Sequence, residues 1–325
     1  MSSSRDLILL ITHSGDFFTI DRVAEALSKK GARPFRFDTD KFPLEVELRA
    51  QFDQSKSSYR LKCGTESIST EEVQAVWMRR LWEPNLGEDM SPQFREACIN
   101  ESNATLSGFW DSLRGVRWVD DLERIKAAQN KQRQLRVASE VGLVIPQTLI
   151  TNDPEAVREF FQQVKGKMVT KLLTALSKNV GYSPFFLYTS TVKEDDLLDA
   201  ESLRYCPMVF QEQIPKQLEL RVVFVQGKVF VGALDASIYE KSKIDWRQPN
   251  ADIGAWQHHE LPDEIVDRIK ALMDHFGLLY GGFDFILTPS GDYVFLEVNP
   301  RGEWGMLERD LELPISNAIA DALIS

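Results

Sequence analysis

Short apolar runs alternate with segments of helical periodicity along the whole chain. Leu7–Thr12 is continuously apolar, as expected of a central parallel strand. A helical pattern over about residues 18–30 ends at Gly31, and residues 34–38 predict a second strand. This strand–helix–strand unit predicts a small α/β lobe. It lacks a Gly-x-Gly-x-x-Gly fingerprint, which argues against a dinucleotide site there.

The same criteria predict the remaining elements. Gly and Pro clusters separate them, and Gln226-Gly227 predicts a tight hairpin turn. The expected elements are a polar hairpin (45–63), strands at 75–80, 116–120, 168–173, 185–188 and 209–215, helices at 92–113, 125–141, 154–164, 262–276 and 314–323, a short helix from 193, and hairpins at 219–231 and 283–299.

The last hairpin carries oxygen ligands where buried strands normally carry apolar side chains. Asp284 interrupts a Phe/Ile/Leu run, while Glu297 and Asn299 are two apart and therefore share a face of their strand. A buried carboxylate is costly unless it is compensated. Three oxygen ligands on paired strands predict a site for a hard cation such as Mg²⁺, held between carboxylates and nucleotide phosphates.

Composition narrows the functional classes. The chain has 325 residues, 43% hydrophobic and 27% charged, which is ordinary for a globular protein of two or three lobes. A net charge of -11 argues against nucleic acid or an anionic membrane as partner. Three cysteines without Cys-x-x-Cys spacing argue against structural zinc, and no signal peptide or membrane-spanning run is evident, so we expect a cytoplasmic protein.

Three further clusters have both a functional and a structural interpretation. Lys171 lies in an apolar strand and needs an anionic partner or a route to solvent. Arg79 and Arg80 end a strand, where they could bind carboxylate or phosphate or form a surface salt-bridge cluster. Acidic residues from 194 to 199 open a short helix, where they could bind a partner or merely favour the helix dipole.

Asp284, followed about a dozen residues later by Glu297-Val298-Asn299-Pro300, resembles the metal-binding signature of the ATP-grasp ligases. This spacing and the following Arg301-Gly302-Glu303 resemble the microviridin-type peptide maturases, from about Leu7 to the C-terminus. The resemblance implies an α/β ATP-grasp fold. It divides the chain into an N-terminal pre-ATP-grasp α/β domain (1–122), a central lobe (123–209) and a C-terminal lobe (210–325), the last two enclosing ATP.

The resemblance also implies roles for single residues. Lys131 and Lys171 would contact the ATP phosphates, Glu212 and Ile214 the adenine, and Glu219 the ribose. Arg221 would bind the phosphate or an acyl phosphate, and Arg247 would stabilise the transferring phosphoryl group. Asp284, Glu297 and Asn299 would hold Mg²⁺. The loop 174–183 has only one glycine, Gly181, which departs from the glycine-rich phosphate lid of many relatives.

The implied activity joins Asp or Glu side chains of a ribosomally made precursor peptide to Lys amines (lactams) or Ser/Thr hydroxyls (lactones) through an acyl phosphate. Overall likeness favours the lactam-forming members. A leader helix carrying an arginine would dock on Asp195, Asp196 and Asp199. The resemblance is compatible with a homodimer, and the sequence leaves the oligomeric state open. The alternatives are a ligase that adds an amino acid to a protein or small acid, and a nucleotide-binding module or kinase.

Overall fold

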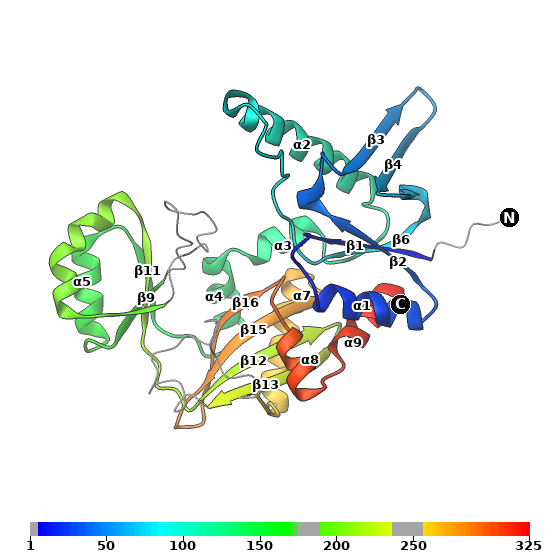
Figure 1. Ribbon diagram of the computed structural model, residues 1–325. Helices are drawn as coiled ribbons and strands as arrows, with labels where there is room; N and C mark the ends of the chain where they lie inside the picture. The colour runs from blue at the N-terminus through cyan, green and yellow to red at the C-terminus, as the bar shows by residue number, and fades with distance from the viewer. Residues whose placement is uncertain (1–5, 172, 174–188, 236–255) are drawn as a thin grey trace.

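The computed structural model describes residues 6–171, 173, 189–235 and 256–325. In this part of the chain the strands form four sheets, and three lobes are visible in Figure 1. The predicted α/β class is confirmed. The predicted strand 185–188, the loop 174–183 and Arg247 lie outside the described residues.

The N-terminal lobe is a parallel sheet between helices. Its strands are β1 (Leu7–Thr12), β2 (Arg33–Asp38), β6 (Val73–Met78) and β7 (Arg117–Val119), in the order β2-β1-β6-β7. Alternation along β1 sends Leu7 and Leu9 into the core shared with helix α2 (Pro92–Ser112), and Ile8 and Leu10 into the core shared with α1 (Thr19–Lys29). The uninterrupted apolar run of β1 therefore reflects burial on both faces.

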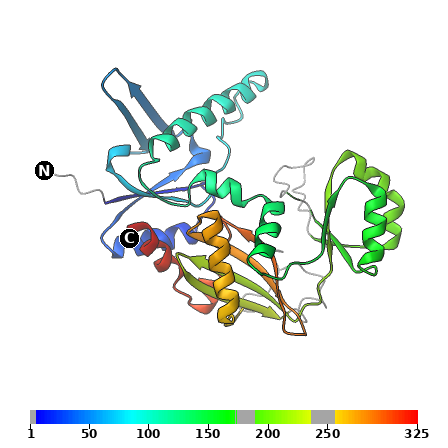
Figure 2. The same cartoon turned by 180° about the vertical axis from the view of Figure 1, so that it is seen from behind.

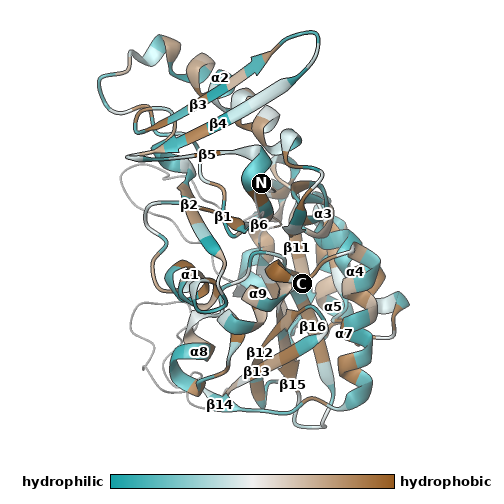
Figure 3. Cartoon of the chain, turned by 90° about the vertical axis from the view of Figure 1, so that its right-hand side faces the viewer, coloured by the Kyte–Doolittle hydropathy of each residue, from teal (hydrophilic) through white to brown (hydrophobic). Residues whose placement is uncertain are grey.

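A small antiparallel sheet projects from this lobe (Figure 3). It consists of β3 (Val46–Phe52), β4 (Ser57–Cys63) and β5 (Glu66–Ser69), with short 3-10 helices at Thr39–Lys41 and Thr70–Glu72. The predicted polar hairpin is confirmed.

The C-terminal helix completes the N-terminal lobe. Helix α9 (Ile315–Ile324) lies beside α1 in Figures 1 and 2. Ala318, Ile319 and Leu323 share one apolar core with Ile8 and Val23. The two ends of the described chain therefore bury one apolar surface together.

The central lobe is a four-stranded sheet, ordered β10-β9-β11-β8, with α5 and the 3-10 turns η3 packed together. Its elements are β8 (Thr148–Thr151), α5 (Pro154–Gln163), β9 (Met168–Lys171), β10 (Ser190–Val192), η3 (Glu194–Tyr205) and β11 (Met208–Glu212). The domain boundary expected between residues 209 and 210 falls within β11.

The C-terminal lobe is a five-stranded sheet, ordered β14-β13-β12-β15-β16. Its strands are β12 (Leu218–Val225), β13 (Lys228–Asp235), β14 (Gln257–His258), β15 (Tyr280–Leu287) and β16 (Tyr293–Asn299). Helix α7 (Asp263–Phe276) covers one face (Figure 2), and α8 (Gly305–Leu311) follows β16. Gln226 and Gly227 have φ of 44° and 85°, so the predicted tight turn is confirmed.

The prediction of one helix over residues 125–141 is wrong. The structure has two helices, α3 (Leu122–Ala128) and α4 (Lys131–Glu140). Asn130 separates them, because its side chain accepts a 3.0 Å hydrogen bond from the Arg133 N–H and so begins a new helix. None of the helices in the described ranges is both long and apolar enough to cross a bilayer.

Candidate active site

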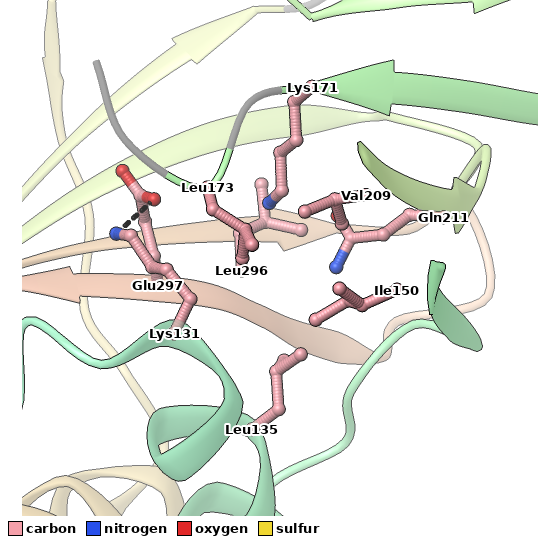
Figure 4. A pocket seen from close by; sticks show the side chains of 9 residues that line it. All are labelled: Lys131, Leu135, Ile150, Lys171, Leu173, Val209, Gln211, Leu296 and Glu297. Carbon is pink, nitrogen blue, oxygen red and sulfur yellow. Dashed lines mark hydrogen bonds and ion pairs between the residues drawn. The ribbon is translucent and has the colours of Figure 1, made fainter. Parts of the chain in front are cut away.

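A pocket lies between the central sheet and the edge of the C-terminal sheet (Figure 4). It has about 330 Å³ of empty space, including its open mouth. Helix α4 contributes Lys131 and Leu135, and β16 contributes Leu296 and Glu297. The central sheet contributes Ile150, Lys171, Val209 and Gln211, and Leu173 lies two residues beyond the end of β9.

The pocket has an apolar part and a charged part. Figure 4 shows Leu135, Ile150 and Val209 gathered at one end, while Lys131 and Glu297 lie at the other and Lys171 reaches between them. Lys131 Nζ donates to Glu297 Oε2 at 2.5 Å. An apolar cleft ending in two lysines suits a planar base joined to phosphates. The sequence-predicted Lys131 and Lys171 are thus brought together with Glu297.

Strand register aligns three charged side chains beside this pocket. Arg221 on β12 is opposite Asp284 on β15, and Asp284 is opposite Glu297 on β16. Directly opposed residues of antiparallel neighbours project from the same face of a sheet. Arg221 Nη1 donates to Asp284 Oδ1 at 2.7 Å. The two predicted carboxylates therefore lie side by side, with a cation on each flank.

A bulge in β16 turns two consecutive residues toward the pocket. Phe285 pairs with Phe295 and Asp284 pairs with Glu297, so Leu296 is the extra residue. A regular strand would send Leu296 and Glu297 to opposite faces, whereas both line the pocket. The bulge thereby places a carboxylate beside an apolar wall.

The predicted magnesium ligands fit a hard cation. Across the described residues, no group of three or more His, Cys, Asp or Glu side chains could hold a metal ion. The predicted ligand set is of another kind, because it combines two carboxylates with one amide. Asp284 and Glu297 are partly exposed oxygen donors, and Mg²⁺ is commonly held by one or two carboxylates with waters and phosphates. Asn299 is exposed, and its Oδ1 accepts the Arg301 N–H at 2.9 Å.

Arg221 is fixed in a buried setting. Its Nε and Nη2 donate to the Glu303 carbonyl at 3.0 and 2.9 Å, and a side chain at Gly282 or Gly302 would collide with its guanidinium. Burial acts to lower the pKa of Arg221, but Asp284 raises it above the ordinary arginine value. The two glycines thus leave room for a charged group that stays protonated.

Sequence reasoning missed Gln134, which holds α4 against the edge of the sheet. Its Nε2 donates to the Val298 carbonyl at 2.8 Å and its Oε1 accepts the Val298 N–H at 3.0 Å. The buried side chain therefore replaces a missing strand partner between Glu297 and Asn299. A polar helix residue gives no sequence signal for this role, because the strand it binds is 164 residues away.

The predicted adenine and ribose contacts lie at the end of β11, in the segment that follows it and on β12, and none of the three residues lines the pocket. The Glu212 N–H donates to the Gln147 carbonyl and the Gln213 N–H to the Lys167 carbonyl, both at 2.9 Å. Within the described ranges, no acceptor is recorded for the Ile214 N–H. Glu219 pairs with Lys216 and does not line the pocket. These three roles stay predictions.

The acidic cluster lies on η3, away from the pocket. Its 3-10 geometry corrects the expectation that Asp195 and Asp199 share a face, because residues three apart align in such turns. Asp196 and Asp199 share the face instead. Asp196 Oδ2 accepts the Lys193 N–H at 2.7 Å, so this side chain stabilises the first turn of η3.

Comparisons with known proteins agree with this geometry. Residues 7–126 match the family model described as the MvdD pre-ATP grasp domain. The chain is 61% identical to macrocyclase MdnB from Microcystis aeruginosa MRC, covering 98% of this chain and 99% of that one, with a TM-score of 0.84. No curated protein gave a significant match.

Two further crystal structures are similar over nearly the whole chain. Macrocyclase MdnC from the same organism, bound with precursor peptide MdnA, is 37% identical, with 98% and 99% coverage and a TM-score of 0.87. A Chryseobacterium gregarium RiPP-associated ATP-grasp ligase, in complex with ADP and a leader and core peptide, is 33% identical, with 98% and 96% coverage and a TM-score of 0.92. The chain therefore belongs to the ATP-grasp ligases that macrocyclise ribosomally made peptides, as its Asp284 and Glu297 signature predicted.

Proposed function

We propose that this enzyme uses ATP and Mg²⁺ to join Asp or Glu side chains of a ribosomal precursor peptide to amines or hydroxyls of the same peptide. The observation that carries the proposal is the juxtaposition of Lys131 and Lys171, at the end of an apolar pocket, with Asp284 and Glu297. Phosphoryl transfer depends mainly on positioning and charge stabilisation, and this arrangement supplies both.

The reaction follows from the chemistry of the carboxylate. A carboxylate oxygen attacks the γ-phosphorus of ATP, the bond to the bridging oxygen breaks, and ADP leaves, which gives an acyl phosphate. An amine or hydroxyl then attacks the carbonyl carbon, phosphate departs, and the nucleophile loses its proton. The whole sequence requires no covalent enzyme nucleophile.

Each residue has a distinct part in this scheme. Lys171 and Lys131 bind phosphate oxygens, and Arg221 holds Asp284 in place while adding positive charge beside the reacting groups. Asp284, Glu297 and Asn299 would hold Mg²⁺, which neutralises phosphate charge when bound. Glu212 and Ile214 would contact the base, and Glu219 the ribose. Arg247, outside the described residues, keeps its proposed role in the transition state.

The partner is a precursor peptide with a leader segment. The proposal draws on the relatives solved with a precursor peptide or with leader and core peptides. We place the leader on η3, at Asp195, Asp196 and Asp199, and expect a homodimer. Among the two ring types, the lactam is our first choice.

The test is incubation of the protein with ATP, Mg²⁺ and a small precursor peptide encoded beside its gene, followed by mass spectrometry. Cyclisation removes one water per bond, whereas amino-acid addition raises the mass and a kinase leaves a stable phosphate. Mild base then distinguishes the rings, because it opens lactones and leaves lactams intact. An unmodified or phosphorylated peptide would contradict the proposal.

A further inference from the structure

One buried glutamine binds three segments that meet beside the pocket. Gln134 is 1% exposed, and its Nε2 donates to the Ala128 carbonyl at 2.5 Å and to the Val298 carbonyl at 2.8 Å. Its Oε1 accepts the Val298 N–H at 3.0 Å. A flipped amide would place its oxygen against two carbonyl oxygens, so these hydrogen bonds fix one orientation. A single side chain therefore ties the end of α3 and the edge of β16 to α4.

The face of α4 that carries Gln134 also carries a pocket lysine. Lys131 and Gln134 are three residues apart, so their side chains lie on the same side of the helix. While Gln134 binds the backbone of Val298, Lys131 Nζ donates to Glu297 Oε2 at 2.5 Å (Figure 4). The contact of Gln134 with β16 therefore determines where Lys131 lies relative to Glu297.

The same contact lies between two of the predicted magnesium ligands. Glu297 and Asn299 flank Val298 and share one face of β16, whereas the Val298 side chain is buried in the core of the lobe. Strand β16 is the last strand of its sheet, so its outer edge needs partners from outside the sheet. Gln134 provides both partners at Val298, and thereby fixes the backbone that joins Glu297 to Asn299.

The bulge at Leu296 is held on both sides by the polypeptide that leads to the central lobe. On one side, the Phe295 N–H donates to the Val144 carbonyl at 2.8 Å. On the other side, Gln134 binds Val298. A bulge interrupts the regular ladder, and a slip of one residue would turn Glu297 to the opposite face. The two contacts therefore keep the Glu297 carboxylate on the pocket side of β16.

We propose that Gln134 is a positioning residue that sets the affinity of the site for Mg²⁺. The inference rests on the proposed function, in which Asp284, Glu297 and Asn299 hold the metal ion. Gln134 does not line the pocket and acts through the backbone of Val298. Removing a group that orients metal ligands typically weakens metal binding by about 10- to 100-fold.

The experiment compares Gln134→Met with Ser316→Ala. The first variant keeps the length of the side chain and removes its donor and acceptor. The second removes a buried hydrogen bond from Ser316 Oγ to Glu308 Oε1, 2.7 Å long, on a helix that does not line the pocket. It therefore controls for a general loss of stability. Calorimetry measures the affinity for ADP over a range of Mg²⁺ concentrations.

We expect Gln134→Met to shift the Mg²⁺ dependence of ADP binding. The Mg²⁺ concentration that gives half of the gain in ADP affinity should rise about tenfold. Without Mg²⁺, the ADP affinity should stay within about threefold, because Lys171 is anchored on β9 rather than on α4. Ser316→Ala should lower the melting temperature and leave the Mg²⁺ dependence unchanged.

The rate of cyclisation provides a second readout. For Gln134→Met it should fall at low Mg²⁺ and return to within about threefold of the wild type at saturating Mg²⁺, because excess metal refills a weakened site. A glutamine that only stabilised the fold would leave the Mg²⁺ requirement of the rate unchanged.

Three results would overturn the inference. They are an unchanged Mg²⁺ requirement in Gln134→Met, the same shift in Ser316→Ala, and an equal loss of ADP affinity with and without Mg²⁺, which would make Gln134 a support of the pocket wall alone. The proposed function fails separately, when the wild-type protein forms no cyclised product although Mg²⁺ still strengthens its binding of ADP. Should Gln134→Met fail to fold, Gln134→Asn, whose amide is one methylene shorter, gives the same readout.

Discussion

Two carboxylate–cation pairs lie side by side at the C-terminal sheet, one of them completed by Lys131 from α4, and they differ in how far they are exposed to solvent. In Lys131–Glu297, the side chains are 27% and 22% exposed and line the pocket. In Arg221–Asp284, they are 5% and 17% exposed, and the Glu303 carbonyl and two glycines confine the arginine. Both pairs join a carboxylate to a cation, but the arginine of the second pair is much less exposed to solvent than the lysine of the first.

The difference separates exchangeable contacts from fixed ones. A pair facing a pocket can give up its partner to a phosphate or a metal ion, because water and ligand replace what is lost. A buried arginine that loses its acid keeps an uncompensated charge, so its partner must stay. We infer that Lys131–Glu297 rearranges when nucleotide binds, whereas Arg221–Asp284 keeps the site in shape.

Glu297→Gln gives the largest expected effect. The rate of cyclisation should fall about 1,000-fold, roughly 4 kcal/mol, because a charged group beside the reacting phosphate is lost. The melting temperature should change by only a few degrees, since the pair is open to solvent. Glu264→Gln, on the exposed surface of α7, is the matched control. More than a few per cent of residual activity at saturating Mg²⁺ would contradict the assignment.

Arg221→Gln tests whether the buried Arg221–Asp284 pair stabilises the fold. It should lower the free energy of unfolding by about 3 kcal/mol, because a buried ion pair with Asp284 is broken. Lys131→Gln should cost less than about 1 kcal/mol, as expected for a pair that water can reach. Urea denaturation measures both. Equal losses would show that burial does not distinguish the two pairs.

Asp120 extends the comparison to a 2% exposed carboxylate for which the described residues provide no ion pair. It accepts the N–H groups of Leu279 and Tyr280 at 2.8 and 3.0 Å, and burial raises its pKa to about 7. The folded state therefore binds more protons than the unfolded state between pH 4 and 7, so the free energy of unfolding contributed by Asp120 falls as pH rises through that window. The slope is at most about 1.4 kcal/mol per pH unit.

Asp120→Asn mimics the protonated acid and should remove this slope. Urea titrations at pH 5, 6, 7 and 8 should show the variant gaining stability relative to the wild type up to about pH 7. Parallel curves for the two proteins would refute the assignment.

The smallest effect is expected for exposed carboxylates. Asp195→Lys combined with Asp199→Lys should weaken leader binding a few-fold at low salt and leave ATP binding unchanged. The difference should vanish as salt increases, because exposed charges are screened within about 10 Å. Calorimetry at two salt concentrations measures it. Unchanged leader affinity at low salt would place the leader elsewhere.

Periodicity and turn chemistry were enough to predict most elements. The hairpin at 283–299, for example, is marked by two apolar runs, and its turn by Pro, Ser, Gly and Asp. The division at Asn130 was not foreseen, since Lys, Gln and Arg on both sides favour continuous helix. The 3-10 turns of η3 were also missed, because their first residues are equally compatible with an α-helix.

Site residues that belong to a local motif could be proposed from the sequence, and the structure brings Asp284 and Glu297 side by side. Residues that depend on distant contacts were not identified. The Gln134 and Arg79 side chains bind partners more than 160 residues away. Only the fold brings these partners together. The bulge at Leu296 likewise depends on how β16 pairs with β15, which composition does not encode.

The position of α9 has a consequence for the order in which the chain can fold during synthesis. The strands of the N-terminal sheet are translated before Ala318 and Leu323, which fill the core beside Ile8 and Val23. A nascent N-terminal lobe therefore exposes an apolar face until α9 has been made. The N-terminal lobe can complete its core only after the central and C-terminal lobes have been translated. The contact between Arg79 and the Arg301 carbonyl therefore forms only at that late stage.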